Sequence, residues 1–535
     1  MKTRADWAPS VAALATAAAL LPFTGKAYHI DDALFLRLAR QIAAHPLRPF
    51  DFFFNWSVTP VPAWLVYLNP PLDSYYLAAV GHWAREREVW THLAFLPFAA
   101  ACAALMMMIA RRLCRRPWPA TLASLAAPAF FVSATSVMAD VPLLTFWLAG
   151  VLATMVAAEP GREAWLWAAA AAAAAAALTK YFGLALVPLC LVYWLFKTKR
   201  ASIHLLSFLC TPAAVAAWGL YSKTQCGFFH PIASGGFALG PRPPGPPSTL
   251  VAAAFLGGGA LWPLALLAAA RSLGRWSLIA AAAVAAAALT ASAVPAAVRA
   301  EWLVLCLGGG LLIAAAAAGA AARPDAESLL LALWLFGTLV FAGLVNWTVN
   351  ERALLPAFFP AALLAARGLE ASPRGLRLLD RWPWVLVPTM IMSLLLARAD
   401  AGQASASRDF AAGRARAFLR EGRDVFFIGH WGFQYYMERE GARAFDYRRP
   451  ALAPGARLCV SLDNSATFPV AKPLRAELSV LDDIRTPAFL GLELTDVPDG
   501  TAGFYDAGFG PVPFALGRDA ADEFLIQAAD PAFQR

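Results

Sequence analysis

The sequence has few charged residues for its length and few cysteines. Of its 535 residues, 15% are charged and 60% are hydrophobic, whereas ordinary globular chains contain roughly 25% and 45–50%. This composition excludes a string of soluble domains and indicates a membrane protein. The seven cysteines are scattered without CxxC spacing, which argues against a disulfide framework or a cysteine metal site.

Several other motifs are missing. The seven histidines show no HxxxH spacing for zinc, and no internal repeat supports a repeat-built transporter. The net charge of +9 arises from basic residues that flank apolar runs, so nucleic acid is not an expected partner. From Asp400 onward a quarter of the residues are charged, against about a tenth before it. The chain therefore has two physically different parts.

The long apolar runs predict membrane crossings. A helix needs about 20 apolar residues to cross a hydrocarbon layer ~30 Å thick. The run that begins at Trp165 is too long for one crossing, and Lys180 marks a reversal within it. We predict about thirteen helices, over residues 7–24, 89–110, 118–135, 141–158, 164–180, 182–196, 203–221, 250–270, 276–295, 301–321, 328–346, 353–366 and 382–398.

The positive-inside rule predicts the orientation. The first apolar run resembles a signal peptide, but the many runs that follow favour a retained first helix. A cytoplasmic N-terminus places most Lys and Arg of the short loops inside, including those at 111–116 and 197–200. The odd number of crossings then places residues 25–88, residues 222–249 and the charged tail outside.

The first outer loop begins with an acidic pair. Residues 30, 34, 38 and 42 form an apolar stripe at helical spacing, which predicts an amphipathic helix along the membrane surface. Asp31 and Asp32 fall at its first turn. One carboxylate is enough to cap a helix, so capping and a catalytic role for the pair both stay open.

The same loop contains Asn69, Pro70, Pro71 and Leu72 and is rich in aromatic residues, including Tyr67. Aromatic side chains at this depth form an interfacial belt in many membrane proteins. They are equally suited to a groove for an isoprenoid chain or a sugar ring, so both interpretations remain.

The tail has the pattern of a soluble α/β unit. Residues 408–422 predict a helix, DVFFIG predicts a buried strand, and FQYYMEREG predicts a helix that ends at Gly441. Residues 457–462 and 474–481 are further strand candidates. The tail lacks the GxGxxG pattern of dinucleotide-binding folds. His430, Trp431 and Tyr435 are suited to stacking on a saccharide or to forming a local core.

The order of several motifs resembles the polytopic glycosyltransferases of the GT-C fold, specifically the protein O-mannosyltransferase-like family 39 with its lipid A aminoarabinose transferases. The resemblance covers residues 1–400 and depends on five features: the acidic pair, NPPL at 69–72, MADVPLLTFW at 138–147, LTKYFGLALVP at 178–188 and ERALLPAFFP at 351–360.

The resemblance implies roles for individual residues. Asp31 matches the proposed general base and Asp32 the second acid of the pair, here Asp instead of Glu. Asn69 stands where relatives often carry a basic residue. Lys180 and Arg352 match basic positions that face the lipid phosphate, and Asp140 matches a recurrent acid. Tyr67 is included as a substrate-binding candidate.

Three of these residues also have a purely structural interpretation. Lys180 fits a snorkelling residue at a helix end, Arg352 fits a local ion pair, and Asp140 fits a helix cap. No cofactor or metal is required for a lipid monophosphate donor. A divalent cation held by Asp31, Asp32 and Asp140 stays open.

We therefore predict a polytopic α-helical membrane protein with a GT-C catalytic domain (residues 1–399) and an extracytoplasmic α/β accessory domain (residues 400–535) that helps hold the acceptor or the loop above the site. The predicted function is inverting sugar transfer from a polyprenyl-phosphate donor to a lipid, glycan or protein hydroxyl, at the outer face of the cytoplasmic membrane. The alternative is a transporter or flippase of a lipid-linked saccharide, which would show charges near the middle of the bilayer.

Overall fold

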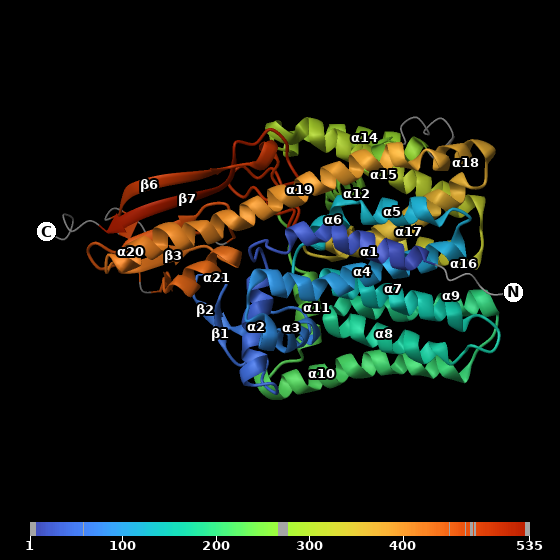
Figure 1. Cartoon of the computed structure of the whole chain (residues 1–535), viewed down its shortest axis with the longest axis horizontal. Helices are drawn as coiled ribbons and strands as arrows, with labels where there is room; N and C mark the ends of the chain where they lie inside the picture. Colours follow the sequence, from blue (N-terminus) through green and yellow to red (C-terminus); the bar gives the residue numbers. More distant parts are fainter. Residues whose placement is uncertain are drawn as a thin grey trace.

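The protein consists of a long helical bundle with a small sheet packed at one end (Figure 1). The computed structural model describes residues 7–56, 58–265, 277–448, 450–465, 467–470, 474–475 and 478–529. The N-terminal end of the described chain lies at the far end of the bundle from the sheet (Figure 1). The sheet of the C-terminal part therefore lies at the opposite end of the bundle from the N-terminus.

The bundle consists mainly of apolar helices. Among the described residues, eight helical stretches are long and apolar enough to cross a membrane, and four shorter apolar helices accompany them. The main helices are α1 (Ala8–Leu20), α4 (Glu88–Leu113), α5 (Pro117–Leu125), α6 (Pro128–Ser133), α7 (Asp140–Ala157), α8 (Trp165–Thr179), α9 (Leu186–Thr198), α10 (Cys210–Cys226), α12 (Ser248–Ala260), α14 (Ser277–Leu289), α15 (Arg299–Ala322), α16 (Ala326–Val340), α17 (Glu351–Leu369) and α19 (Trp382–Phe410). This is a multi-pass membrane protein.

Each predicted crossing contains helical structure, and the differences have local causes. The range 118–135 is divided into α5 and α6, and Pro128 begins the second piece, because proline is well tolerated in a first helical turn but not in a helix interior. Residues 266–270 and 276 of two predicted crossings lie outside the described residues. The exact number of thirteen crossings stays a prediction.

Glycine and alanine allow the helices to approach closely. A Cβ atom added to Gly309 of α15 would lie 1.9 Å from the Ala253 backbone oxygen of α12. A Cβ atom on Gly183 would lie 2.3 Å from the backbone of Ala176. Small residues at such interfaces bring backbones into van der Waals contact, which stabilises helix association in lipid.

The first loop lies between the bundle and the sheet (Figure 1). It contains α2 (Asp32–Ala44), the hairpin of β1 (Phe53–Asn55) and β2 (Pro60–Pro62), and α3 (Leu72–Ala84). The predicted apolar stripe of α2 is buried, with Leu38 only 1% exposed, and the helix packs on α3 and on α21 (Trp431–Glu440). The stripe therefore packs into the protein and not against lipid.

The C-terminal part forms a mixed five-stranded sheet in the order β4-β3-β5-β7-β6. Its strands are β3 (Val425–Ile428), β4 (Arg443–Ala444), β5 (Arg457–Ser461), β6 (Leu478–Pro487) and β7 (Ala520–Ala529). The predicted strands at β3 and β5 are confirmed, and α21 ends at Gly441 with φ 102°, a conformation that glycine adopts readily.

One continuous helical stretch joins the bundle to the sheet. It runs over 39 residues, from Trp382 to Arg420, and includes α19 and the short α20 (Arg416–Arg420). The predicted boundary between residues 399 and 400 falls inside α19. The division into two domains at that point stays a prediction.

Candidate active site

A cavity of about 1090 Å³ lies where the bundle, the first loop and the C-terminal part meet. Its wall includes the beginnings of α2, α7 and α17, the reversal between α8 and α9, and part of the chain between β6 and β7. Six of the seven predicted site residues line it: Asp31, Tyr67, Asn69, Asp140, Lys180 and Arg352. Only Asp32 is not part of the wall.

Asp31 and Arg352 form an ion pair at the cavity wall. The Arg352 guanidinium donates to Asp31 Oδ2 at 2.8 Å, and the two side chains are 15% and 26% exposed. Asn350 caps α17 by accepting a hydrogen bond from the Ala353 amide, and this places Arg352 in the first turn. Because both groups face the cavity, one carboxylate and one cation lie within reach of the same ligand.

Asp140 and Lys180 form a second pair, 2.6 Å apart. Asp140 begins α7, and Lys180 ends α8 in an extended conformation before the reversal. Asp140 is almost fully buried, whereas the Lys180 side chain is 23% exposed. The ammonium therefore remains accessible from the cavity.

Asp32 has a different position. It is fully buried, and its two carboxylate oxygens accept the backbone amides of His29 and Val137, both at 3.0 Å. Burial raises the pKa of this carboxyl to about 7, against the effect of Lys26 and of the two amide hydrogen bonds. Asp32 therefore joins the first loop to the segment before α7, and both of its carboxylate oxygens already accept hydrogen bonds.

Tyr67 and Asn69 contribute in different ways. The Tyr67 hydroxyl donates to the backbone oxygen of Leu34, so its ring lines the cavity while its polar group holds α2. Asn69 lines the cavity beside Pro70. Its amide carries no charge, which leaves Lys180 and Arg352 as the cations of the described cavity wall.

The cavity continues into the apolar bundle. Trp147, Leu189, Val192 and Trp334 line this deeper part, which extends on the order of 18 Å along the chain from Lys180 to Val192. Pro188 of α9 and Leu333 of α16 line the cavity and are also exposed. The cavity wall therefore includes exposed positions on both helices.

The sequence predicted an accessory role for the C-terminal part, but Tyr505, Asp506 and Phe509 were not among the candidate site residues. Trp431, Tyr505, Asp506 and Phe509 all line the cavity. Trp431 has φ 58°, a strained conformation for a bulky residue that occurs preferentially at functional sites. No local pattern places these residues near the bundle, although Trp431 was identified as a candidate for saccharide stacking.

A buried polar network lies behind the cavity wall and was also missed. Lys26 pairs with Asp400, and both side chains are fully buried. The Tyr505 hydroxyl donates to the other Asp400 oxygen at 2.8 Å. Burial and the adjacent Asp400 raise the pKa of Tyr505 well above its ordinary value, so the hydroxyl stays a donor. In the sequence, the only signals of this network were the charge of Lys26 just after the first span and the charge of Asp400 in α19.

A further buried acid, Asp73 of α3, lies close to Asp140 and Lys180. It is 3% exposed, and neither carboxylate oxygen has a hydrogen-bond partner among the described residues. Burial, together with the charge of Asp140, raises the pKa of Asp73 well above its ordinary value. The surroundings of Asp73 therefore favour the protonated form of its carboxyl more than water does.

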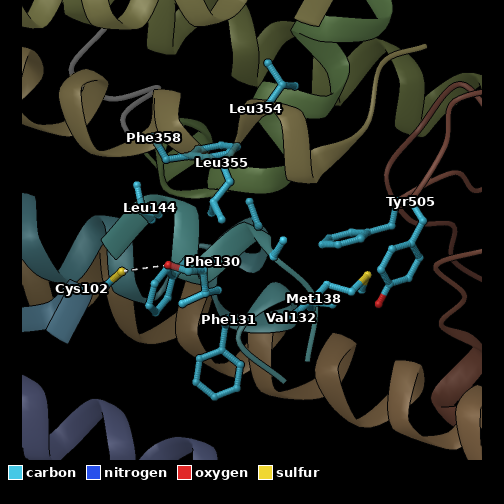
Figure 2. Close-up of a cluster of buried hydrophobic side chains, with 14 of the residues drawn as sticks. Cys102, Phe130, Phe131, Val132, Met138, Leu144, Leu354, Leu355, Phe358 and Tyr505 are labelled. Atoms are coloured by element: carbon cyan, nitrogen blue, oxygen red, sulfur yellow. Dashed lines mark hydrogen bonds between the residues drawn. The ribbon is translucent and has the colours of Figure 1, made fainter. Parts of the chain in front are cut away.

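Apolar packing supports the charged groups. Figure 2 draws Met138 and Tyr505 with buried side chains of α6 and α17, such as Phe130 and Leu355. The Arg352 guanidinium lies 2.9 Å from Met138 Sδ and over the Tyr505 ring at 5.5 Å. This support restricts the orientation of the guanidinium, because both neighbours belong to the closely packed core.

Comparison with known proteins identifies the architecture. Residues 69–222 match the family model for dolichyl-phosphate-mannose-protein mannosyltransferases. The fold is similar over 98% of both chains to that of ArnT from Cupriavidus metallidurans bound to undecaprenyl phosphate, with 14% identity and a TM-score of 0.53. The chain has the GT-C glycosyltransferase fold. The family match and this fold together support glycosyltransferase activity.

Two further structures are similar to this GT-C chain. ArnT from Cupriavidus metallidurans in the apo state covers 97% of both chains at 15% identity, with a TM-score of 0.48. The arabinofuranosyltransferase AftD from Mycobacteria matches 97% of this chain and 40% of its own, at 14% identity and a TM-score of 0.46. A search of curated protein sequences finds no match.

Proposed function

We propose that this GT-C protein transfers a sugar, with inversion, from a polyprenyl-phosphate donor to a hydroxyl group of a lipid, glycan or protein. The observation that carries the proposal is the convergence of Asp31, Arg352, Asp140 and Lys180 on one cavity that continues into the apolar bundle. A polar headgroup and a long apolar tail on one molecule match the two ends of this cavity.

In the proposed reaction Asp31 is the general base. The acceptor O–H gives its proton to the Asp31 carboxylate while its oxygen forms a bond to the anomeric carbon of the sugar. The bond from that carbon to the phosphate oxygen breaks in the same step, and polyprenyl phosphate leaves. One displacement inverts the anomeric centre, and one carboxylate is sufficient.

Arg352 and Lys180 stabilise the leaving phosphate. Negative charge grows on its oxygens in the transition state, and fixed cations in a site that excludes water lower the barrier most. Arg352 has donors left for this task. Among the described residues, Asp31 is the only oxygen partner of its guanidinium, and its buried Nε has no partner there. Asn69 adds an uncharged contact to the donor headgroup.

The apolar part of the cavity holds the polyprenyl tail, which enters sideways between α9 and α16. The rings of Trp431 and Phe509 stand at the other end, 5.4 Å apart and edge to face, and offer an apolar surface to the acceptor. ArnT from Cupriavidus metallidurans, which shares the fold, was crystallised bound to undecaprenyl phosphate. This supports a lipid-phosphate donor.

The proposal needs no metal ion. Asp31 and Asp140 are each paired with a cation, and both oxygens of Asp32 accept backbone amides. The carboxylates of all three acids therefore already have partners in the chain, either a cation or backbone amides. Among the described residues, no group of three His, Cys, Asp or Glu side chains has an arrangement that would hold a metal ion.

We place the site at the outer face of the cytoplasmic membrane, because the positive-inside rule assigns the opposite end of the bundle to the cytoplasm. The site and the C-terminal sheet lie at the same end of the molecule (Figure 1). Cysteine labelling of intact cells at Asp51 and Asp499, both in exposed positions, tests this topology. Labelling only after membrane disruption would reject it.

The decisive experiment is transfer by the purified protein. The protein is supplied with lipid extract that contains polyprenyl-phosphate sugars, and products are identified by mass spectrometry, alongside surface glycans and lipids of a strain without the protein. We expect a glycosylated acceptor of inverted anomeric configuration. Movement of the lipid-linked sugar across a vesicle membrane without transfer would instead support a flippase.

A further inference from the structure

Tyr505 belongs to the C-terminal part yet lies in the wall of the donor cavity. It is 2% exposed, and its ring lies under the Arg352 guanidinium, with 5.5 Å between the guanidinium carbon and the ring centroid. A cation at this distance from an aromatic face is attracted to it, more strongly when both are desolvated. The ring therefore limits where Arg352 can point.

The position of the Tyr505 ring is itself fixed by a buried charge pair. The Tyr505 hydroxyl donates to Asp400 of α19 at 2.8 Å, and the other Asp400 oxygen accepts the Lys26 ammonium. Lys26 also donates to Thr135 at 3.3 Å, just before α7. Lys26, Asp400 and Tyr505, which are far apart in the sequence, thus meet at the Asp400 carboxylate.

The backbone around Tyr505 holds the segment that carries Arg352. The Glu351 amide donates to Phe504 O at 3.0 Å, and the Ala507 amide donates to Val349 O at 2.8 Å. The Thr348 hydroxyl adds a bond of 2.5 Å to Asp506. These contacts attach residues 504–507 to the start of α17. The position of Arg352 therefore depends on how the C-terminal part packs against the bundle.

A buried ion pair is weak evidence for stability, because desolvation costs about as much as the attraction returns. Lys26 and Asp400 bind no ligand in the proposed reaction, and neither lines the cavity. Their most direct neighbour in the cavity wall is Tyr505, which suggests that the pair specifies geometry.

We propose that Tyr505 is a positioning residue for Arg352, anchored by Asp400 and Lys26, and that through it the C-terminal part sets the affinity of the cavity for the donor phosphate. This inference rests on the proposed function. It assigns the C-terminal part to the donor site, in addition to any contact that it makes with the acceptor.

The test measures binding of undecaprenyl phosphate and of undecaprenol, which has the same tail without the phosphate, to the full-length protein in nanodiscs. The variants are Tyr505→Phe, Asp400→Asn and the double variant. We expect Tyr505→Phe to weaken undecaprenyl phosphate binding about tenfold and to leave undecaprenol binding unchanged. The double variant should be no weaker than Asp400→Asn alone, because both changes break one chain of contacts.

Tyr76→Phe is the matched control, since it removes a hydroxyl bond to the Ala94 backbone outside the cavity and should change neither affinity. Equal losses for both lipids in Tyr505→Phe would show general loosening and overturn the inference, as would unchanged phosphate binding. If the wild-type protein binds neither lipid, the proposed function fails and the inference fails with it. Tyr505→Phe keeps the ring, so the variant is expected to fold, and thermal unfolding checks this.

Discussion

Arg352 of α17 and Asp31 of the first loop are 321 positions apart in the chain and share a hydrogen bond of 2.8 Å. The pair places a base beside the cation that is proposed to bind the leaving phosphate. A phosphate that draws on the remaining Arg352 donors is thereby brought next to the carboxylate that accepts the proton. Donor binding and base placement are linked by a single guanidinium group.

Asp31→Asn should remove the base and leave the binding groups in place. We expect kcat to fall about 10²–10⁴-fold, the contribution typical of general base catalysis. Binding of undecaprenyl phosphate should persist, because Arg352 loses a competing partner. Initial rates of sugar transfer and equilibrium binding measure the two effects, and a normal transfer rate would show that Asp31 is not the base.

Lys180→Met should weaken the use of the donor. We expect KM for the donor to rise at least about tenfold, since a hydrogen bond to a charged group contributes about 1.5–3 kcal/mol. The variant also leaves Asp140 buried and unpaired, which is destabilising.

Lys180→Met combined with Asp140→Asn separates these two effects. The double variant should regain thermal stability, because no buried charge is left unpaired, but it should not regain donor affinity. Recovery of a wild-type KM in the double variant would show that Lys180 only compensates Asp140.

Gly337→Phe should block the polyprenyl tail. Gly337 of α16 lines the cavity, and a Cβ atom added there meets no atom within 4 Å, so a side chain at this position starts in open space. We expect loss of transfer from a long-chain donor and retention with a short-chain analogue. Gly402→Phe is the control, because a Cβ atom at Gly402 also meets nothing within 4 Å and Gly402 does not line the cavity. Equal transfer from both donors in Gly337→Phe would exclude this path for the tail.

Asp32→Asn should destabilise the fold. Both Asp32 oxygens accept backbone amides, and the asparagine NH₂ group would face one of those donors. The loss of one buried hydrogen bond costs about 1–3 kcal/mol. Asp51→Asn is the control, since its pair with Arg48 is highly exposed and contributes little. Equal thermal midpoints for the two variants would contradict the connecting role of Asp32.

Glu493 should make the C-terminal part less stable at alkaline pH. Burial, together with the nearby Asp463 and Asp496, raises the pKa of Glu493 from 4.5 to about 9. The folded state therefore binds more protons than the unfolded state between these values, and stability falls as pH rises from about 4.5 to about 9. Glu493→Gln should flatten this dependence. Thermal unfolding at pH 6 and pH 8.5 measures it, and an unchanged slope in the variant would exclude Glu493 as its source.

The sequence by itself determined the class of the protein, the approximate ranges of its apolar helices, the α/β character of the tail and six polar or aromatic residues of the cavity wall. Hydropathy and helical spacing are local properties, and a charge at the end of an apolar run is visible without coordinates. Asp31 and Lys180 were found in this way, whereas Arg352 was identified through the resemblance to family 39.

Only the tertiary structure decided which charges meet. It paired Asp31 with Arg352, buried Asp32 under two backbone amides, and brought Tyr505 and Asp400 to the same cavity wall. The adjacent carboxylates of Asp31 and Asp32 have different surroundings, because successive residues at a helix start point about 100° apart. Contacts across hundreds of residues depend on how the helices pack, and that packing leaves no periodic signal in the sequence.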